Sequence, residues 1–167
     1  LVRGLFGLDD AAGGARAKAV IAWNPKTNEV RSGQVKAGQG FEYWLLKFDG
    51  VSGNKDKELD DPQGYGLIEY AYYLMALDCG IVMNECRLFN ENGRSHFMTR
   101  RFDRQNGGKQ HIQTLCAMHH LDFKQRATHD YDQYFQAIAA LKLPESALEE
   151  GFRRMVFNVL AANCDDH

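Results

Sequence analysis

The chain has 167 residues, of which 44% are hydrophobic and 25% charged, which excludes a disordered chain and is enough to bury a core. Its 20 basic and 22 acidic residues leave a net charge of -2, so its overall charge favours neither direct nucleic-acid binding nor membrane attraction. No apolar run predicts a membrane span, and no signal peptide is evident. The four cysteines form no Cys-x-x-Cys pair, which favours reduced thiols in a cytoplasmic protein over a zinc ribbon or a disulfide framework.

The first part of the chain predicts an antiparallel sheet. An apolar strand is expected at 19–23, and turn residues at 24–28 return the chain through a second strand at 29–35. A strand rich in aromatic residues follows at 41–48. Residues 49–61 contain glycines and many charges and predict a loop.

A helix and a hairpin come next. Pro62 stands where a helix could begin, apolar residues then recur at helical spacing, and Gly80 is a stop signal. The Asn-Gly pair at 92–93 lies between two short apolar runs within 87–99, which predicts a β-hairpin.

The remaining chain predicts mainly helices. After a polar loop at 105–110, helical patterns occur at 111–119 and 130–141. Pro144 opens a final helix, and 146–149 fit a capping box. The buried stripe of this helix is predicted to be Leu148, Phe152, Val156, Val159 and Leu160.

This order, with strands and one helix before a run of helices, is typical of the α+β class rather than of alternating βαβ units. We predict a β-rich N-terminal lobe at 1–104 and the start of a helical lobe at 105–167. Because the chain lacks an initial Met and stops within a cluster of titratable residues, we expect it to be part of a longer polypeptide.

Two segments suggest phosphate binding. The small residues Gly13 and Gly14 would let backbone N–H groups approach a phosphate, although an ordinary glycine turn is more common and no Walker or Gly-x-Gly-x-x-Gly pattern is present. Lys47 lies near the end of an apolar strand, where it is either solvated or able to neutralise phosphate charge. Glu69 interrupts an apolar helix face and is either an edge carboxylate or the ion-pair partner of Lys47.

Three other polar groups have two interpretations each. The charged segment 99–104 is either a solvated strand end or a connector whose backbone near Arg100 and Phe102 meets a base edge. The histidines and Cys116 within 111–120 match no zinc spacing, so surface histidines are favoured. Asp165, Asp166 and His167 follow the last helix and are either solvent-facing or able to supply a general base or metal ligands.

Four segments together resemble the HipA family, the serine/threonine kinase toxins of type II toxin–antitoxin modules. In chain order they are the stretches at 13–18 (GGARAK), 44–48 (WLLKF), 101–104 (RFDR) and 157–167, where Phe157-Asn158 precedes NCDDH. The resemblance covers nearly the whole chain, and RFDR followed by the last segment is specific as a set.

The resemblance implies a protein-kinase-like, bilobed fold related to lipid kinases, with ATP between the lobes. The residues implied to contact the phosphates are Gly13, Gly14, Ala15, Lys18 and Lys47, and Glu69 would steady Lys47. The backbone of Arg100, Arg101 and Phe102 would form the hinge that receives adenine. Asp165 would be the catalytic aspartate, with His167 after it in the same loop.

Two departures from the family pattern affect these expectations. The Asn and Asp that hold Mg2+ follow the histidine in the family, so no metal ligand is assigned here, and this piece alone is not expected to transfer phosphate efficiently. A regulatory Ser of some members is replaced by the stretch at 10–12 (DAA), which puts control by autophosphorylation in doubt.

The expected function is therefore that of an ATP-dependent protein serine/threonine kinase toxin that uses Mg2+. The resemblance implies a protein substrate, such as an aminoacyl-tRNA synthetase, and a helix-turn-helix antitoxin partner. Two alternatives stay open: a catalytically inactive kinase-like module that binds nucleotides or a partner, and a small-molecule phosphotransferase of the aminoglycoside type, which the RFDR set fits less well.

Overall fold

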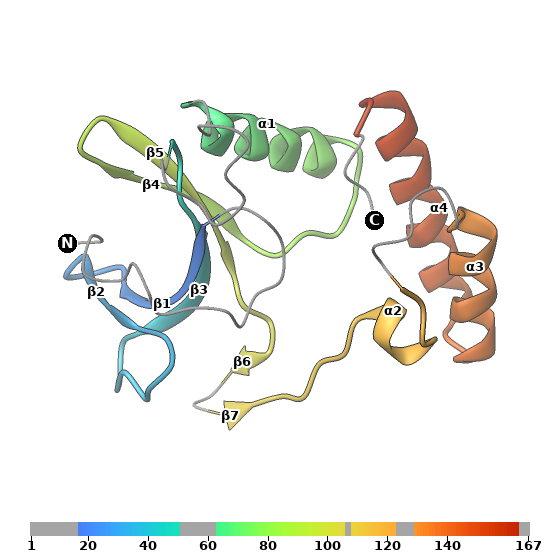
Figure 1. Ribbon diagram of the computed structural model, residues 1–167, viewed down its shortest axis with the longest axis horizontal. Coiled ribbons are helices and arrows are strands. Elements are labelled where there is room, and N and C mark those ends of the chain that lie inside the picture. Colours follow the sequence, from blue (N-terminus) through green and yellow to red (C-terminus); the bar gives the residue numbers. More distant parts are fainter. Residues whose placement is uncertain (1–16, 51–62, 106–107, 123–128, 164–167) are drawn as a thin grey trace. The chain divides into compact units, whose positions relative to one another are not determined.

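The computed structural model describes residues 17–50, 63–105, 108–122 and 129–163 (Figure 1). These residues contain an antiparallel sheet and four helices, which confirms the α+β class. They fall into two compact units: one comprises the described residues up to 74 and those within 84–110, and the other comprises 75–83 and those from 111 onward. Within the described ranges, no helix has the length and apolar character needed to cross a membrane.

The first unit contains a five-stranded sheet in the order β2-β1-β3-β5-β4, in which all neighbours are antiparallel. The predicted strands are confirmed, with small changes in their ends. β2 stops three residues early, before Gly33, whose close contact with Val20 leaves no room for a side chain. The strands are β1 (Lys18–Asn24), β2 (Glu29–Ser32), β3 (Glu42–Lys47), β4 (Cys86–Glu91) and β5 (Arg94–Arg100).

The predicted hairpin is formed by β4 and β5. Its two turn residues, Asn92 and Gly93, have φ of 51° and 74°. Positive φ at both positions is what a type I′ turn requires, and Asn-Gly adopts it with little strain. The turn fixes the register in which Glu91 pairs with Arg94.

The apolar core lies on one face of the sheet. Trp44 and Leu46 of β3 are fully buried, and the Trp44 ring meets the Trp23 ring edge-on at 5.8 Å. Side chains alternate between the faces of a strand, so Leu45 and Lys47 project to the other face. The core packing therefore determines on which face of the sheet Lys47 is presented.

The predicted helix is α1 (Tyr65–Asp78), so it begins at Tyr65, three residues after the expected opener Pro62, which lies outside the described residues. It ends before Gly80, whose φ of 72° confirms the predicted stop.

The predicted polar loop at 105–110 is wrong in one respect. β6 (Arg104–Gln105) and β7 (Gly108–Lys109) pair there as a short antiparallel ladder.

The second unit contains three further helices. The helix expected at 111–119 is only one turn long, α2 (Leu115–Met118), and Thr114 caps it. α3 (Tyr131–Ala140) confirms the prediction at 130–141 and begins with a capping box between Asp130 and Gln133. The last helix is α4 (Glu145–Leu160).

Two predictions about α4 are wrong. Pro144 is the N-cap and makes no side-chain capping bond, so Ser146 lies inside the helix and forms no capping box. Among the stripe residues, Phe152 and Leu160 are 57% and 81% exposed. Helix α4 instead packs against α3 through buried Gly151, where an added Cβ would come within 3.0 Å of Tyr134. Close approach at a glycine turns the packing face away from the larger apolar residues.

Candidate functional site

Lys47 and Glu69 form an ion pair in the first unit. Nζ of Lys47 donates a hydrogen bond to Oε2 of Glu69 at 2.7 Å, and the two side chains are 38% and 23% exposed. The lysine comes from the end of β3 and the glutamate from the second turn of α1. The predicted pairing of these two residues is therefore present.

Lys18 shares this face of the sheet. It lies directly opposite Lys47 in the β1–β3 register, and opposite residues of an antiparallel pair project to the same side. Like charges in this arrangement oppose folding slightly. Two of the residues expected to meet phosphate are thus adjacent, on the face opposite the apolar core.

A glycine allows α1 to approach the sheet closely enough for Glu69 to reach Lys47. A Cβ on Gly66 would lie 1.9 Å from the backbone oxygen of Ser95 and 3.2 Å from the backbone nitrogen of Phe97. The first turn of α1 therefore rests directly on the backbone of β5. Glu69 is three residues further along, about one helical turn.

The backbone of the expected hinge continues from β5. The N–H of Arg100 donates to the carbonyl of Glu85 at 2.8 Å, and the N–H of Arg101 donates to the carbonyl of Tyr43 at 2.9 Å. These bonds fix the segment between the starts of β3 and β4. The side chain of Phe102, which follows, is 53% exposed.

Asp103 holds the side chains of this segment together. Its carboxylate is 2% exposed and accepts two hydrogen bonds of 2.7 Å from the guanidinium of Arg101, and Arg104 donates to the same carboxylate. The hydrogen bonds from Arg101 lower the pKa of Asp103 against the opposing effect of burial. The sequence motifs did not single out Asp103, although its position between two arginines was a signal. The interpretation of this stretch as a solvated strand end is wrong at Asp103.

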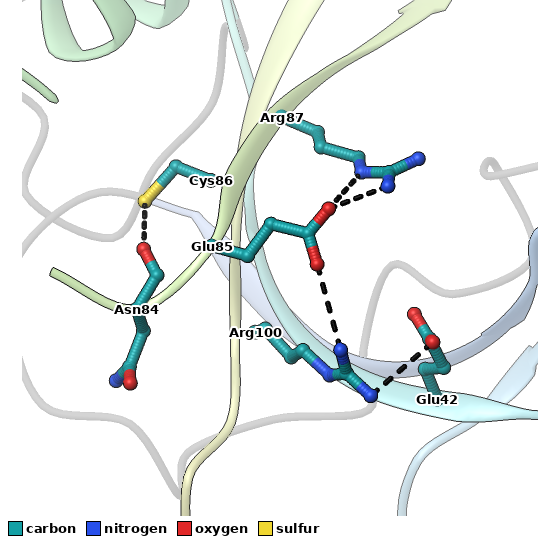
Figure 2. Close-up of polar contacts among 6 residues, drawn as sticks. All are labelled: Glu42, Asn84, Glu85, Cys86, Arg87 and Arg100. Carbon is teal, nitrogen blue, oxygen red and sulfur yellow. Dashed lines mark hydrogen bonds and ion pairs between the residues drawn. The ribbon is translucent and has the colours of Figure 1, made fainter. Parts of the chain in front are cut away.

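The core-side surface at the end of β5 carries a chain of ion pairs (Figure 2). The guanidinium of Arg100 contacts Glu42 at 3.2 Å and Glu85 at 3.5 Å. Glu85 also accepts a hydrogen bond of 2.6 Å from Arg87, whose guanidinium lies 5.8 Å from the ring centre of Trp44.

Cys86, next to Glu85 in sequence, is buried, and burial raises the pKa of its thiol, so it is a poor nucleophile.

The expected hinge borders a polar cavity of about 420 Å³. Arg100 pairs with Trp44 in the sheet, so its side chain lies on the core face, whereas Lys47 lies on the other. Lys47 is not among the residues that line this cavity. The residues that line it are Phe41, Glu42, Tyr43, Asn84, Glu85, Arg100, Arg101, Phe102, Arg104 and Gln105.

In the second unit, hydrogen bonds fix the chain just after α4. The amide of Asn158 donates to the hydroxyl of Tyr131 at 2.9 Å, and its oxygen accepts from the amide of Asn163 at 3.1 Å. The backbone N–H of Asn163 also donates to the carbonyl of Asn158, at 2.9 Å. Two asparagines of the last motif thus hold the segment that leads toward Asp165.

Several predicted site residues lie outside the described residues. These are Gly13, Gly14 and Ala15 of the small-residue loop, together with Asp165 and His167. The structure therefore brings together Lys18, Lys47 and Glu69, and separately the hinge segment. The roles assigned to the other five stay predictions.

Comparison with known proteins identifies a family. The family model described as the HipA-like C-terminal domain matches residues 11–167. No curated protein and no solved structure matches the chain.

Proposed function

This chain belongs to the HipA-like family, and on that premise we propose that the natural protein that carries it is an ATP-dependent serine/threonine protein kinase, the toxin of a toxin–antitoxin module. The observation that carries the proposal is the Lys47–Glu69 ion pair. It joins a strand to the helix that follows, as in protein kinases, where such a pair holds the lysine against ATP phosphates. A kinase-like, bilobed fold is part of the proposal, supported by the strand order β2-β1-β3-β5-β4 with a helix between β3 and β4.

The small contribution of the Lys47–Glu69 pair to stability favours a functional role for it. A pair as exposed as Lys47–Glu69 contributes about 0.2–1 kcal/mol to stability. This is small beside the total stability of a domain. Its main effect is to hold one ammonium group in a fixed orientation on the sheet face that also carries Lys18.

In the proposed reaction, a substrate hydroxyl oxygen attacks the γ-phosphorus of ATP, the bond to the β–γ bridging oxygen breaks, and ADP leaves. Lys47 and Lys18 neutralise phosphate charge, and Asp165 takes the proton of the hydroxyl. The backbone of Gly13, Gly14 and Ala15 covers the phosphates. The hinge backbone of Arg100–Phe102 receives adenine, and His167 supports the loop of Asp165.

ATP is proposed to bind with Mg2+, which would offset phosphate charge. Within the described ranges, no group of three His, Cys, Asp or Glu side chains is arranged to hold a metal ion. We therefore assign Mg2+ no ligand and no step in the reaction. A protein substrate such as an aminoacyl-tRNA synthetase, a helix-turn-helix antitoxin and a cytoplasmic location are family expectations that the same proposal includes.

Transfer of labelled phosphate from ATP tests the proposal in the natural protein. We expect transfer to a protein substrate or to the protein itself, and a loss of at least about a hundredfold in Lys47→Ala and Asp165→Asn. Lys26→Ala is a matched control, because Lys26 is an exposed lysine in the β1–β2 turn, and it should keep the wild-type rate. Wild-type transfer by a folded Lys47→Ala variant would refute the assignment. ATP binding without transfer would favour the inactive nucleotide-binding module.

A further inference from the structure

Asp49 is a buried carboxylate close to the Lys47–Glu69 pair. It follows Lys47 by two residues, just past the end of β3, and is 4% exposed. Its Oδ1 accepts hydrogen bonds from the backbone N–H groups of Gly64 at 2.9 Å and Gly66 at 3.3 Å, and its Oδ2 accepts from Gly64 at 3.1 Å. A carboxylate that leaves water needs such partners, and here helix α1 supplies them.

These bonds make Asp49 the cap of helix α1. The carbonyl of Gly64 accepts from the N–H groups of Leu67 and Ile68, so Gly64 occupies the N-cap position. A glycine has no side chain with which to cap the helix, and Asp49, fifteen residues earlier, does so instead. Its negative charge also lies at the positive end of the helix dipole.

The backbone of Asp49 is hydrogen-bonded to side chains of β5. Its backbone N–H donates to Nδ1 of His96 at 2.9 Å, and its carbonyl accepts from Arg94 at 3.3 Å. His96 is buried and packs edge-on against Phe48 at 5.6 Å. Asp49 thus binds β5 through its backbone and α1 through its side chain.

We propose that Asp49 is a positioning residue that sets the geometry of the Lys47–Glu69 pair. One residue ties the end of the lysine-bearing strand to the start of the glutamate-bearing helix. Glu69 lies about one turn after Gly66, so a shift of the first turn moves its carboxylate away from Lys47. The effect on Lys47 follows from geometry alone, whereas the effect on catalysis rests on the proposed kinase function.

The chemical reactivity of Lys47 separates this role from simple helix capping. An amine held in a hydrogen bond to a carboxylate is acylated more slowly than one that has been released. Each variant of the natural protein is treated briefly with acetic anhydride, and acetylation of Lys47 is quantified by mass spectrometry relative to exposed Lys26. Glu69→Gln defines the released state. We expect Asp49→Asn to raise Lys47 acetylation several-fold, as Glu69→Gln does, and the double variant to exceed neither single variant.

Phosphate transfer is the second readout. Asp49→Asn should lower kcat/KM for ATP about ten- to a hundredfold, comparable to Glu69→Gln, because a misplaced lysine loses contact with developing charge. Asp130→Asn is the matched control. It alters the cap of α3 in the second unit, so it should leave Lys47 acetylation unchanged.

The outcomes separate the two proposals. If Asp49→Asn lowers thermal stability but leaves Lys47 acetylation at the wild-type value, Asp49 is only a cap and the positioning role is wrong. If the wild-type protein transfers no phosphate, the kinase function fails, while acetylation still decides the role of Asp49. If Asp49→Asn does not fold, Asp49→Glu decides, because it keeps the negative charge at the start of α1 while its longer side chain displaces the first turn of the helix: raised acetylation supports the role and wild-type acetylation overturns it.

Discussion

Asp103 shows how one buried charge can organise a segment that looks solvent-exposed in sequence. Arg101 and Arg104, with side chains 16% and 19% exposed, both bind its carboxylate. Because its pKa is lowered from 3.8, Asp103 contributes stability that is present above pH 3.8 and is lost as the pH falls through its folded pKa. Both arginine side chains are thereby held at one buried carboxylate.

Asp103→Asn should cost about 3 kcal/mol of unfolding free energy. It leaves two partly buried guanidinium groups without a counter-charge, which is far more costly than losing an exposed ion pair. Glu29→Gln is the matched control, because Glu29 forms an exposed ion pair with Arg31 at 2.8 Å and should cost less than about 1 kcal/mol. Urea unfolding measures both values. Equal costs would show that Asp103 contributes no more than a surface carboxylate.

His96 makes stability depend on pH. Burial lowers its pKa from 6.5 and Arg94 acts in the same direction, whereas Asp49 and Glu91 oppose the shift. The unfolded chain therefore takes up the proton first as the pH falls. Stability from this group is complete above about pH 7.5 and is lost below pH 6.5, through the folded pKa, at up to about 1.4 kcal/mol per pH unit.

Unfolding free energies measured from pH 8 to pH 5 test this dependence. His96→Asn should flatten the curve, because the amide oxygen can still accept from the Asp49 N–H and does not titrate. His111→Asn, a substitution at an exposed histidine, should keep the wild-type curve. A wild-type slope in His96→Asn would assign the pH dependence to other groups.

At the scale of elements, the contact between α1 and β5 depends on the absence of one side chain. Gly66→Ala places a Cβ where the backbone oxygen of Ser95 now lies, and neither backbone can move without disturbing the helix or the sheet. We expect a loss of about 3 kcal/mol or more. Gly108→Ala is the control, since its Cβ would only touch Gln105 at 3.5 Å, and it should change stability by less than about 0.5 kcal/mol. Thermal unfolding distinguishes them, and similar values would mean that α1 tolerates displacement.

The end of α4 shows the same dependence on local hydrogen bonds. Asn158 bridges Tyr131 of α3 and Asn163 beyond the helix, so the polar residues of the last motif link two helices to the segment that follows. The body of α4 meets α3 at Gly151, where an added Cβ would lie 3.0 Å from Tyr134.

At the scale of the whole chain, patterns set by local chemistry were predictable. Apolar and aromatic runs bounded by turn residues predicted the strands, Asn92-Gly93 predicted the hairpin, and an isolated glutamate in an apolar helix gave the ion pair with Lys47 as one of two interpretations. Features that depend on tertiary contacts were not. Asp49 was assigned to a loop and Asp103 to a charged stretch, because charged residues are rarely buried and their partners come from other elements. The prediction of the buried face of α4 was wrong, because the close contact at Gly151 and not the apolar stripe determines which face packs against α3.

Binding of ATP should stabilise the whole protein if the proposed function holds. A ligand at a hundred times its Kd adds about 2.7 kcal/mol to the unfolding free energy, which is a measurable rise in Tm. Much of the affinity should come from Lys47 meeting the phosphates, so AMP should give a smaller shift than ATP, and Lys47→Ala should abolish most of the difference. Differential scanning fluorimetry with both nucleotides measures this, with Lys26→Ala as the control. Equal shifts for wild type and Lys47→Ala would place the phosphates away from the Lys47–Glu69 pair, and no shift with ATP would exclude both a kinase and an inactive nucleotide-binding module.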